Sequence, residues 1–350
     1  MIVSFQWQKE GHRARKVTQK RPQMNVKKTS VMINYYAKFE NRLLTLFAVM
    51  LIALAFAISS AKGATLEKDD LAMVSDKSNV WRVQSADGAG SFSAIQWGLD
   101  GDVRVPADFD GDGVKDLAVW RPANGTWYVL ASRDGRTMQI QWGLTTPYPT
   151  GGIEDVPVPA DFDGDKIADL AVWRPVNGKW YVLTSKSGFA SSIVVEWGLY
   201  GDIPVPADYD GDGRADVAVF RSMQNRWLIA ESKTGNLRSE EFGISGDDLL
   251  VPADYTGDGR ADIAIYRAGT WHLIDSANGE FEEFQFGYPD AKPVPADYNG
   301  DGTTDYAFFR RGMWYIYESG EARLRVVKFG GAGEVPLNSL SVKASLVAVR

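Results

Sequence analysis

The segment Val105-Pro-Ala-Asp-Phe-Asp-Gly-Asp-Gly-Val-Lys-Asp-Leu-Ala-Val-Trp-Arg121 is the first of five closely related copies in this chain of 350 residues. Their opening aspartates are 53, 47, 46 and 43 residues apart, a spacing that indicates a repeat architecture. The other copies are Val158–Arg174, Val205–Arg221, Val251–Arg267 and Val294–Arg310, and a degraded sixth begins at Val335 and ends at Arg350.

Each repeat contains the signals of four short β-strands. In the first copy these are Val105-Pro, Leu117–Arg121, Trp127–Leu130 and Gln141–Gly143. β-Branched and aromatic residues fill these runs, and Asp-Gly or Asn-Gly turns separate them. Four strands within 43–53 residues match the blade of a β-propeller, which typically takes about 40–50 residues.

The two ends of the repeat region complement each other. The chain enters with third-strand and fourth-strand segments at Val80–Val83 and Ala94–Gly98, and it leaves with first-strand and second-strand segments at Val335 and Leu346–Arg350. We predict that these half-blades pair and close an all-β, six-bladed propeller, which removes an exposed sheet edge. The alternative is an open linear solenoid, in which complementary half-blades would have no purpose.

Residues 1–61 have the features of a secretion signal. They carry ten Lys/Arg and two acids, and Leu43–Ile58 is an apolar run broken only by Thr45. Small residues follow, so we expect cleavage after Ala61 or Gly63; an uncleaved anchor and a buried core helix are the alternatives. Because the basic part is long for a signal, translation could start at Met32.

This leader sets the predicted domain organisation. Residues 1–61 are the leader and signal, residues 62–79 a linker, and residues 80–350 the propeller. We expect a secreted or cell-envelope protein with no membrane span after cleavage. The propeller region with its linker has a net charge of about −15, so it is a poor partner for nucleic acid and a good one for cations.

The repeated loops have the composition of calcium sites. Asp108, Asp110, Asp112 and Asp116 occupy positions 1, 3, 5 and 9 of the first loop, and Gly113 at position 6 permits a sharp bend. The carbonyl of position 7 would add a further oxygen. Carboxylates this close repel one another without a counter-ion, and oxygen ligands suit a hard cation. We predict up to five structural Ca²⁺ sites; solvated acidic turns are the alternative.

The copies of the loop differ in completeness. Lys166 replaces the position-6 glycine in the second loop, and Thr256 and Asn299 replace position-3 carboxylates in the fourth and fifth. The degraded sixth copy lacks acids and is expected to be metal-free. The candidate ligands are Asp108, Asp110, Asp112, Asp116, Asp161, Asp163, Asp165, Asp169, Asp208, Asp210, Asp212, Asp216, Asp254, Thr256, Asp258, Asp262, Asp297, Asn299, Asp301 and Asp305.

The Asp-x-Asp-Gly-Asp-Gly-x-x-Asp loops and the Trp-Gly or Phe-Gly strand ends resemble FG-GAP/VCBS-type repeats, relatives of the integrin α-subunit propeller. The resemblance covers about residues 80–350. It implies an extracellular β-propeller with calcium in its hairpin loops. Such families serve in adhesion, in glycan binding or as accessory modules of enzymes.

Composition restricts the chemistry further. The chain has no Cys, and its two His are His12 and His272, which excludes disulfides, Cys-ligated zinc and multi-His metal centres in the propeller. No nucleophile elbow or phosphate-binding loop occurs, so we expect no catalytic residues. We interpret His272 as structural and place the unrepeated acids Glu154-Asp155, Asp247-Asp248 and Glu282-Glu283 near strand ends.

Two rows of aromatic residues and one row of arginines also repeat. We interpret both aromatic rows as packing between blades, with stacking on sugar rings as the alternative for the tryptophans. The arginines are expected to pair with loop acids or to stack on aromatic rings, and an anion-binding ring is the alternative. The rows are Trp81, Trp127, Trp180, Trp227, Trp271 and Trp314; Trp120, Trp173, Phe220, Tyr266 and Phe309; and Arg121, Arg174, Arg221, Arg267, Arg310 and Arg350.

These features predict an exported, calcium-binding β-propeller that acts as a binding or adhesion module for a glycan or a surface protein. One alternative is a polysaccharide-degrading enzyme, a hydrolase or lyase, built on a calcium-loop propeller. Another is a purely structural component of the cell envelope.

Overall fold

The computed structural model describes residues 70–75, 77–85, 93–144, 155–244, 246–337 and 342–343. The predicted signal and the possible start at Met32 lie outside these residues, as do Glu154 and Leu346–Arg350. Within the described part, no helix is long and apolar enough to cross a membrane.

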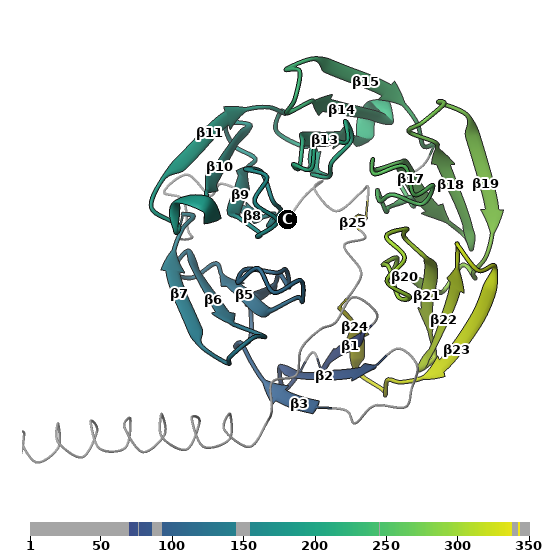
Figure 1. Ribbon diagram of the computed structural model, residues 1–350, viewed down its shortest axis with the longest axis horizontal. Coiled ribbons are helices and arrows are strands. Elements are labelled where there is room, and N and C mark those ends of the chain that lie inside the picture. Colours follow the sequence, from purple (N-terminus) through teal and green to yellow (C-terminus); the bar gives the residue numbers. More distant parts are fainter. Residues whose placement is uncertain are drawn as a thin grey trace, which may run out of the picture. The chain divides into compact units, whose positions relative to one another are not determined.

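Six antiparallel sheets are arranged in a ring, each with its shortest strand at the centre and its fourth strand at the rim (Figure 1). The predicted all-β, six-bladed propeller is therefore confirmed. Blade 1 contains β24 (Glu334–Pro336), β1 (Asp70–Ser75), β2 (Val80–Ser85) and β3 (Ser93–Gln96); blade 2 contains β4 (Val103–Arg104), β5 (Leu117–Arg121), β6 (Thr126–Leu130) and β7 (Thr137–Gln141); blade 3 contains β8 (Val156–Pro157), β9 (Leu170–Arg174), β10 (Lys179–Leu183) and β11 (Ser192–Glu196).

The other three blades follow in chain order. Blade 4 contains β12 (Ile203–Pro204), β13 (Val217–Arg221), β14 (Arg226–Ala230) and β15 (Leu237–Glu241); blade 5 contains β16 (Leu249–Leu250), β17 (Ile263–Arg267), β18 (Thr270–Ile274) and β19 (Phe281–Gln285); blade 6 contains β20 (Lys292–Pro293), β21 (Tyr306–Arg310), β22 (Met313–Glu318) and β23 (Arg323–Lys328). Two short 3₁₀ turns lie at Ser185–Ser187 and Ser222–Gln224.

Blade 1 closes the ring by pairing the two terminal segments, as predicted, but the division of its strands differs. β1 pairs with β24, with Val74 opposite Val335, so three strands come from the N-terminal segment and one from the C-terminal segment. The prediction of two from each was wrong, and the propeller begins inside the segment 62–79 that was expected to be a linker. The physical reason is that Asp70-Leu-Ala-Met-Val repeats the second-strand pattern and buries its apolar side chains completely.

A further strand that the sequence did not predict lies on the central side of blade 5. β25 (Val342–Lys343) pairs antiparallel with β16, so that Lys343 lies opposite Leu249 and Val342 opposite Leu250. This sheet therefore has five strands, and β25 lies toward the centre of the ring (Figure 1).

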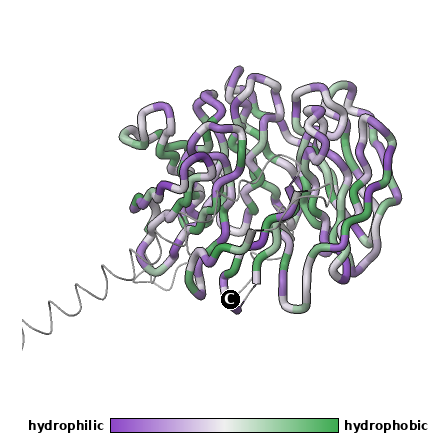
Figure 2. The backbone as a smooth tube through the Cα atoms, turned by 60° about the horizontal axis from the view of Figure 1, so that its bottom comes forward, coloured by the Kyte–Doolittle hydropathy of each residue, from purple (hydrophilic) through white to green (hydrophobic). Residues whose placement is uncertain are grey.

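The predicted tryptophan row is a packing element in every blade. All six side chains are at most 1% exposed. The indole Nε1–H of Trp127 donates to the carbonyl of Trp142 at 2.9 Å, and that of Trp180 donates to Trp197 at 2.9 Å. The glycine that follows has a separate physical reason, because Gly143 has a φ of +119° and a Cβ there would lie 3.1 Å from the Trp120 ring. Hydrophobic and hydrophilic segments alternate along the backbone tube in Figure 2.

The strands end on two different faces. On one, which we call the loop face, the acidic loop joins the first strand to the second, and it meets the turn after the third strand where Ser132 N donates to Asp116. On the other, the crossover face, the hairpin between the second and third strands meets the crossover to the next blade. There Trp142 N donates to the Gly125 carbonyl at 2.8 Å.

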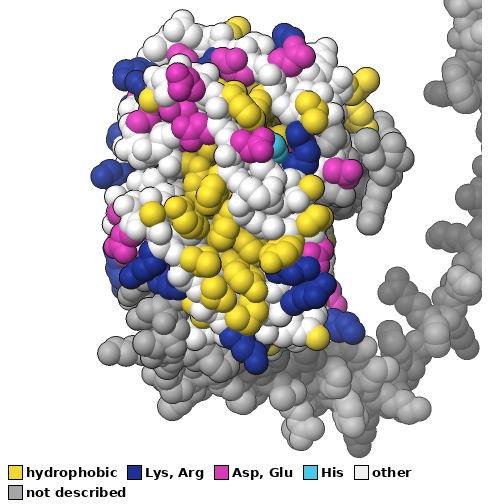
Figure 3. Space-filling view, turned by 90° about the vertical axis from the view of Figure 1, so that its right-hand side faces the viewer, with side chains coloured by type: hydrophobic (Ala, Val, Ile, Leu, Met, Phe, Trp, Pro, Cys, Tyr) yellow, Lys and Arg dark blue, Asp and Glu magenta, His cyan; other side chains and the backbone are white. Residues whose placement is uncertain are grey.

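The rim has its own exposed apolar side chains on the fourth strands. On the side of blades 5 and 6, Phe281 of β19 and Leu324 and Val326 of β23 are 46–56% exposed. Figure 3 shows apolar side chains gathered over this side of the ring. The fourth strands are the edge strands of the described sheets, so these side chains lie along the outer edge of the propeller.

Candidate metal sites

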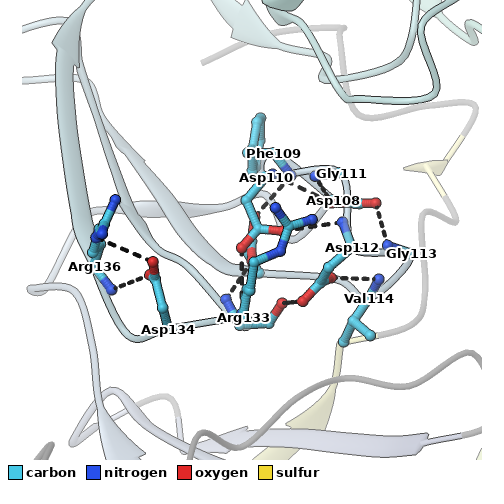
Figure 4. Close-up of polar contacts among 12 residues, drawn as sticks. Asp108, Phe109, Asp110, Gly111, Asp112, Gly113, Val114, Arg133, Asp134 and Arg136 are labelled. Carbon is cyan, nitrogen blue, oxygen red and sulfur yellow. Dashed lines mark hydrogen bonds and ion pairs between the residues drawn. The ribbon is translucent and has the colours of Figure 1, made fainter.

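Each acidic loop is folded around the carboxylate at its first position. In blade 2, Asp108 Oδ1 accepts the N–H of Gly111 at 2.7 Å and Oδ2 accepts the N–H of Gly113 at 2.8 Å (Figure 4). The same two bonds recur in all five loops, at 2.6–2.9 Å. The position-1 aspartate therefore fixes the turn and presents its oxygens to the inside of the loop.

The second loop keeps this turn although Lys166 replaces glycine. Lys166 has a φ of +69°, close to the +86° of Gly113, and its N–H donates to Asp161 Oδ2 at 2.7 Å. The bend is thus the same as in the other loops. A side chain in this left-handed region costs about 1–2 kcal/mol, so the loop is strained, as the sequence suggested. The strain is tolerated because a Cβ at Gly113 or Gly213 would have no atom within 4 Å.

The position-9 aspartate is the most buried acid of each loop. Asp116 is 0% exposed, and it accepts the N–H of Phe109 at 2.7 Å and of Ser132 at 2.6 Å. Burial raises the pKa of Asp116 to about 6, with the Asp110 charge as a smaller contribution in the same direction. Asp216 and Asp305 have pKa values raised to about 6 by the same burial. A cation beside these carboxylates would remove the cost of their charge.

In three loops the carboxylates of positions 1, 3 and 9 converge, with ligand atoms all within 4.8 Å of one another. These acidic triads are Asp108, Asp110 and Asp116 in blade 2; Asp161, Asp163 and Asp169 in blade 3; and Asp208, Asp210 and Asp216 in blade 4. They contain three of the four predicted ligands in each loop.

The fourth predicted ligand, at position 5, lies outside the triad. Asp112 Oδ1 accepts the N–H of Val114 at 2.9 Å, and Asp112 Oδ2 accepts the hydroxyl hydrogen of Ser132 at 2.9 Å. This carboxylate therefore caps the end of the loop. The equivalent Asp165 accepts the N–H of Ile167 and the hydroxyl of Ser185 on a single oxygen, Oδ1, at 2.9 and 3.0 Å.

The triads fit a divalent hard cation. Each offers only carboxylate oxygens, and Asp163 Oδ1 in the second triad is buried without a hydrogen-bond partner. Buried oxygens of this kind need a donor or a cation. The sequence of alternating aspartates was sufficient to find these residues.

The fourth and fifth loops bring together fewer acids. Thr256 supplies a hydroxyl at position 3 of the fourth loop. In the fifth, Asn299 Nδ2 donates to Asp301 Oδ2 at 2.9 Å, and this bond lowers the pKa of Asp301. In both loops the position-1 aspartate still forms the turn and the position-9 aspartate is still the buried acid. The bonds that show this belong to the remaining predicted ligands, Asp254, Asp258, Asp262, Asp297 and Asp305. Of the segment expected to be metal-free, residues 338–345, the structure describes only β25, which pairs with β16 of blade 5.

Main-chain hydrogen bonds connect each loop to the next. The Asp108 carbonyl accepts the N–H of Ala168 at 2.6 Å, and the Asp161 carbonyl accepts that of Ala215 at 2.6 Å. The Asp208–Ala261 and Asp254–Thr304 pairs continue the series at 2.6 and 2.7 Å. The position-1 aspartate therefore has two structural roles. Its side chain forms the turn of its own loop, and its main-chain carbonyl accepts a hydrogen bond from the loop of the next blade.

The opposite face has a second set of acids that sequence reasoning did not recognise as a repeat. Arg121 at the end of β5 donates to Asp102 through Nε at 2.8 Å and Nη2 at 2.9 Å, and Asp102 Oδ2 accepts the N–H of Leu99 at 2.8 Å. We call this arrangement the crossover clamp. It recurs as Arg174–Asp155, Arg221–Asp202 and Arg267–Asp248, each bidentate, and as a looser Arg310–Asp290 pair in which only the Nε bond is formed to a half-exposed carboxylate.

The predicted pairing is confirmed for the five repeated arginines that the structure describes, although their partners are crossover acids, and Arg350 lies outside the described residues. Stacking is also present: Arg121 lies 4.3 Å from the Tyr128 ring centre and Arg174 lies 4.1 Å from that of Tyr181. Asp155 and Asp248 looked unrepeated in the sequence because the crossovers vary in length. Their spacing of 19 residues before the arginine, shared by four clamps, is a signal that could have found them.

The single histidine of the propeller lies on the rim and not in an acidic triad. Its Nδ1 is 3.4 Å from Glu283 Oε2, and its ring stacks on Phe281. Burial lowers the pKa of His272.

The fold and the three acidic triads define a repeat β-propeller with oxygen-lined loops on one face. Comparison with known families assigns the repeats: residues 108–172, 161–219 and 208–265 each match the FG-GAP-like repeat. Residues 108–265 of the propeller thus consist of FG-GAP-like repeats, as the loops and strand ends indicated. Comparison with curated protein sequences found no match.

Solved structures share the fold at low sequence identity. A lectin of Agrocybe aegerita that recognises non-reducing terminal N-acetylglucosamine is 16% identical over 78% of this chain and 85% of its own, with a TM-score of 0.50. A catalytically inactive virginiamycin B lyase from Staphylococcus aureus is 13% identical over 77% of this chain and 89% of its own, with a TM-score of 0.46. At these identities the likeness concerns the fold alone.

Proposed function

We propose that this protein is an exported, calcium-stabilised β-propeller that acts as a binding or adhesion module for a glycan or a surface protein. The observation that carries the proposal is the division between the two faces. Acidic triads and main-chain bonds brace the loop face, and apolar side chains are displayed on the crossover face. A rigid scaffold with a variable exposed surface is the usual arrangement of binding modules.

The exposed apolar residues of the crossover face are part of the repeat. Each directly follows the aromatic-glycine pair that ends a fourth strand, and the exposed fractions are 38–75%. They are Leu99, Leu144, Leu199, Ile244 and Tyr288. Exposed apolar side chains gathered on one face favour association with a partner.

Calcium is the cation that the donor set favours. Ca²⁺ takes about six to eight oxygen ligands in flexible geometry, and carboxylates, main-chain carbonyls and water all serve. Positions 1, 3 and 9 would hold the ion in each triad. With so few protein ligands we expect a Kd of about 10⁻⁴–10⁻³ M, which suits a structural ion in an extracellular module.

The acids outside the triads support binding over catalysis. Asp102 and Asp202 are each engaged by two guanidinium N–H groups, and each also accepts a main-chain N–H. A carboxylate held in this way is not available as a general acid or base. Among the described residues, no observation favours the alternative of a polysaccharide-degrading enzyme.

Export is tested by sequencing the N-terminus of protein recovered outside the cytoplasm. We expect the mature chain to begin at Lys62 or Ala64, because small residues follow the apolar run there. An intact leader embedded in the membrane would contradict the proposal.

Ligand binding is tested with the mature chain on arrays of glycans and of extracellular proteins, with calcium and with chelator. We expect calcium-dependent binding that Ile244→Asp abolishes, since this residue is 75% exposed on the crossover face. Leu237→Asp is the matched control, because Leu237 is 68% exposed on the rim strand β15 and should leave binding unchanged. Binding that is equally sensitive to both variants would contradict the crossover face as the binding surface.

A further inference from the structure

A cavity of about 510 Å³ lies between blades 3 and 4 on the crossover face. Its walls include the Trp197 indole, Leu199, Leu228 and the Arg221 guanidinium, with Asn177 and Glu196 as polar neighbours. Its volume is within the range of about 300–1,000 Å³ that small ligand sites occupy.

The corresponding places in blades 2 and 3 are filled by tyrosine rings. The frame is the same at three successive blade interfaces, where an indole N–H donates to the main-chain carbonyl of Tyr128, Tyr181 or Leu228. The Tyr128 ring covers Arg121 and the Tyr181 ring covers Arg174, at 4.3 and 4.1 Å. Leu228 stands at this position in blade 4 and has no ring to offer Arg221.

The hydroxyl of each tyrosine also has a partner from the adjacent hairpin. Asn124 Nδ2 donates to the Tyr128 hydroxyl at 3.0 Å, and Asn177 Nδ2 donates to that of Tyr181 at 3.1 Å. The filled sites therefore recognise both the face and the hydroxyl of a phenol. Gln224 occupies the equivalent place in the blade 4 hairpin and retains an amide donor.

The Arg221 guanidinium is held in position without a ring. It donates to Asp202 through Nε at 2.8 Å and through Nη2 at 2.7 Å, and the Asp202 side chain is only 2% exposed. This bidentate clamp fixes the plane of the guanidinium, so a ligand that stacks on it does not have to order it first. Leu199 at the mouth of the cavity is 61% exposed and adds an apolar contact.

We propose that this cavity binds the aromatic ring of a tyrosine side chain presented by a protein partner. The partner would supply in blade 4 the ring that blades 2 and 3 supply from their own chain, stacked on Arg221 beside Trp197. The inference rests on the proposed function as a binding module and names the class of partner, a protein with an exposed tyrosine. A sugar ring, which can also stack on an indole, is the competing occupant that the experiment separates.

The experiment measures binding of N-acetyltyrosinamide to the mature chain in saturating calcium, by ligand-observed NMR titration. N-Acetylleucinamide is the probe that lacks a ring, and methyl N-acetylglucosaminide is the sugar probe. We expect saturable binding of the tyrosine probe alone. Leu228→Tyr fills the cavity from within and should weaken binding by about tenfold or more, since it removes the stacking site.

Tyr181→Leu is the complementary variant, because it should open an equivalent cavity over Arg174 and add a second site for the probe. Leu237→Tyr is the matched control, because it introduces the same ring on the rim strand β15, outside the cavity, and should bind as the wild type does. Calcium melting curves show that each variant is folded and test the proposed function separately. Absence of saturable tyrosine binding, equal binding to Leu228→Tyr, or preference for the sugar probe would overturn the inference, and none of these would change the calcium dependence.

Discussion

The loop face and the crossover face are built from the same repeats, but they differ in how closely the blades match one another. On the loop face the same residue types make the same bonds in five loops, and the triads are nearly interchangeable. On the crossover face the clamp repeats, whereas the position held by Tyr128 and Tyr181 is Leu228 in blade 4 and His272 in blade 5. The loop face is therefore nearly uniform around the ring, and the crossover face combines a repeated clamp with side chains that vary.

The largest expected effect is that of calcium removal, which acts on the loop face alone. Binding to the folded state adds about 1.4–2.7 kcal/mol per site at tenfold to hundredfold saturation, so three triads should together raise Tm by about 10 °C or more. Calorimetric scans in calcium and in chelator measure the shift. Asp110→Ala and Asp210→Ala should each abolish most of one site's share, and Thr256→Ala should do less. Identical scans in calcium and in chelator would contradict the calcium sites and would indicate that the loops are solvated acidic turns.

Breaking one crossover clamp should destabilise the propeller independently of calcium. Asp202→Ala leaves the Arg221 guanidinium without its partner and the N–H of Leu199 without its acceptor, a loss of about 2–4 kcal/mol in the free energy of unfolding. Denaturant unfolding in calcium and in chelator should give the same loss. Asp134→Ala removes an exposed ion pair with Arg136 and is the matched control, with a change of at most about 0.5 kcal/mol. If the loss of stability in Asp202→Ala is seen in calcium but not in chelator, the clamp and the calcium sites are energetically coupled, which contradicts the prediction.

The apparent calcium affinity should fall at acid pH. In the metal-free protein, burial raises the pKa of Asp116 and Asp216 to about 6, above the ordinary value of 3.8. The folded state therefore binds more protons than the unfolded state between these values, so the stability of the metal-free protein decreases as pH rises through this window. Calcium must displace that proton, and affinity at pH 5 should be about tenfold lower than at pH 7.5.

Isothermal titration in two buffers of different ionisation enthalpy checks this proton release. Release at pH 5 and none at pH 7.5 is the expected result. An affinity that does not change between the two pH values would show that these buried acids are not among the ligands.

The smallest effect concerns the strained turn of the second loop. Lys166→Gly should stabilise the protein by about 1 kcal/mol, because glycine adopts the positive φ of this position without steric cost. Gly213→Lys is the reverse variant at the same position of the third loop and should lose a similar amount. Thermal unfolding in excess calcium compares the two. Equal stability of both variants and the wild type would mean that position 6 carries no strain.

The repeat itself was enough to predict the blade count, the loop turn and the tryptophan core, because each is encoded by residues at a fixed spacing. The strand β1 was missed because Asp70–Ser75 repeats only the second-strand pattern and has no acidic loop before it. The position-5 aspartates stay predicted ligands, and residue spacing alone did not show that Asp112 also accepts hydrogen bonds from Ser132 and from the N–H of Val114. The cavity over Arg221 could not be predicted from the sequence. It results from one difference, Leu228 in place of a tyrosine, and the sequence does not show that the tyrosine rings of the neighbouring blades stack on the equivalent arginines.

The pairing of β24 with β1 also determines when the ring can close during folding. Arg82 pairs with Glu334, 252 residues further along the chain, so blade 1 waits for almost the last strand of the propeller. Contacts this distant in sequence form late, since their loop-closure entropy must be met first. During synthesis, the ring stays open until β24 has been made. Until then the edge of β1 that β24 will occupy is free to pair with a strand of another chain.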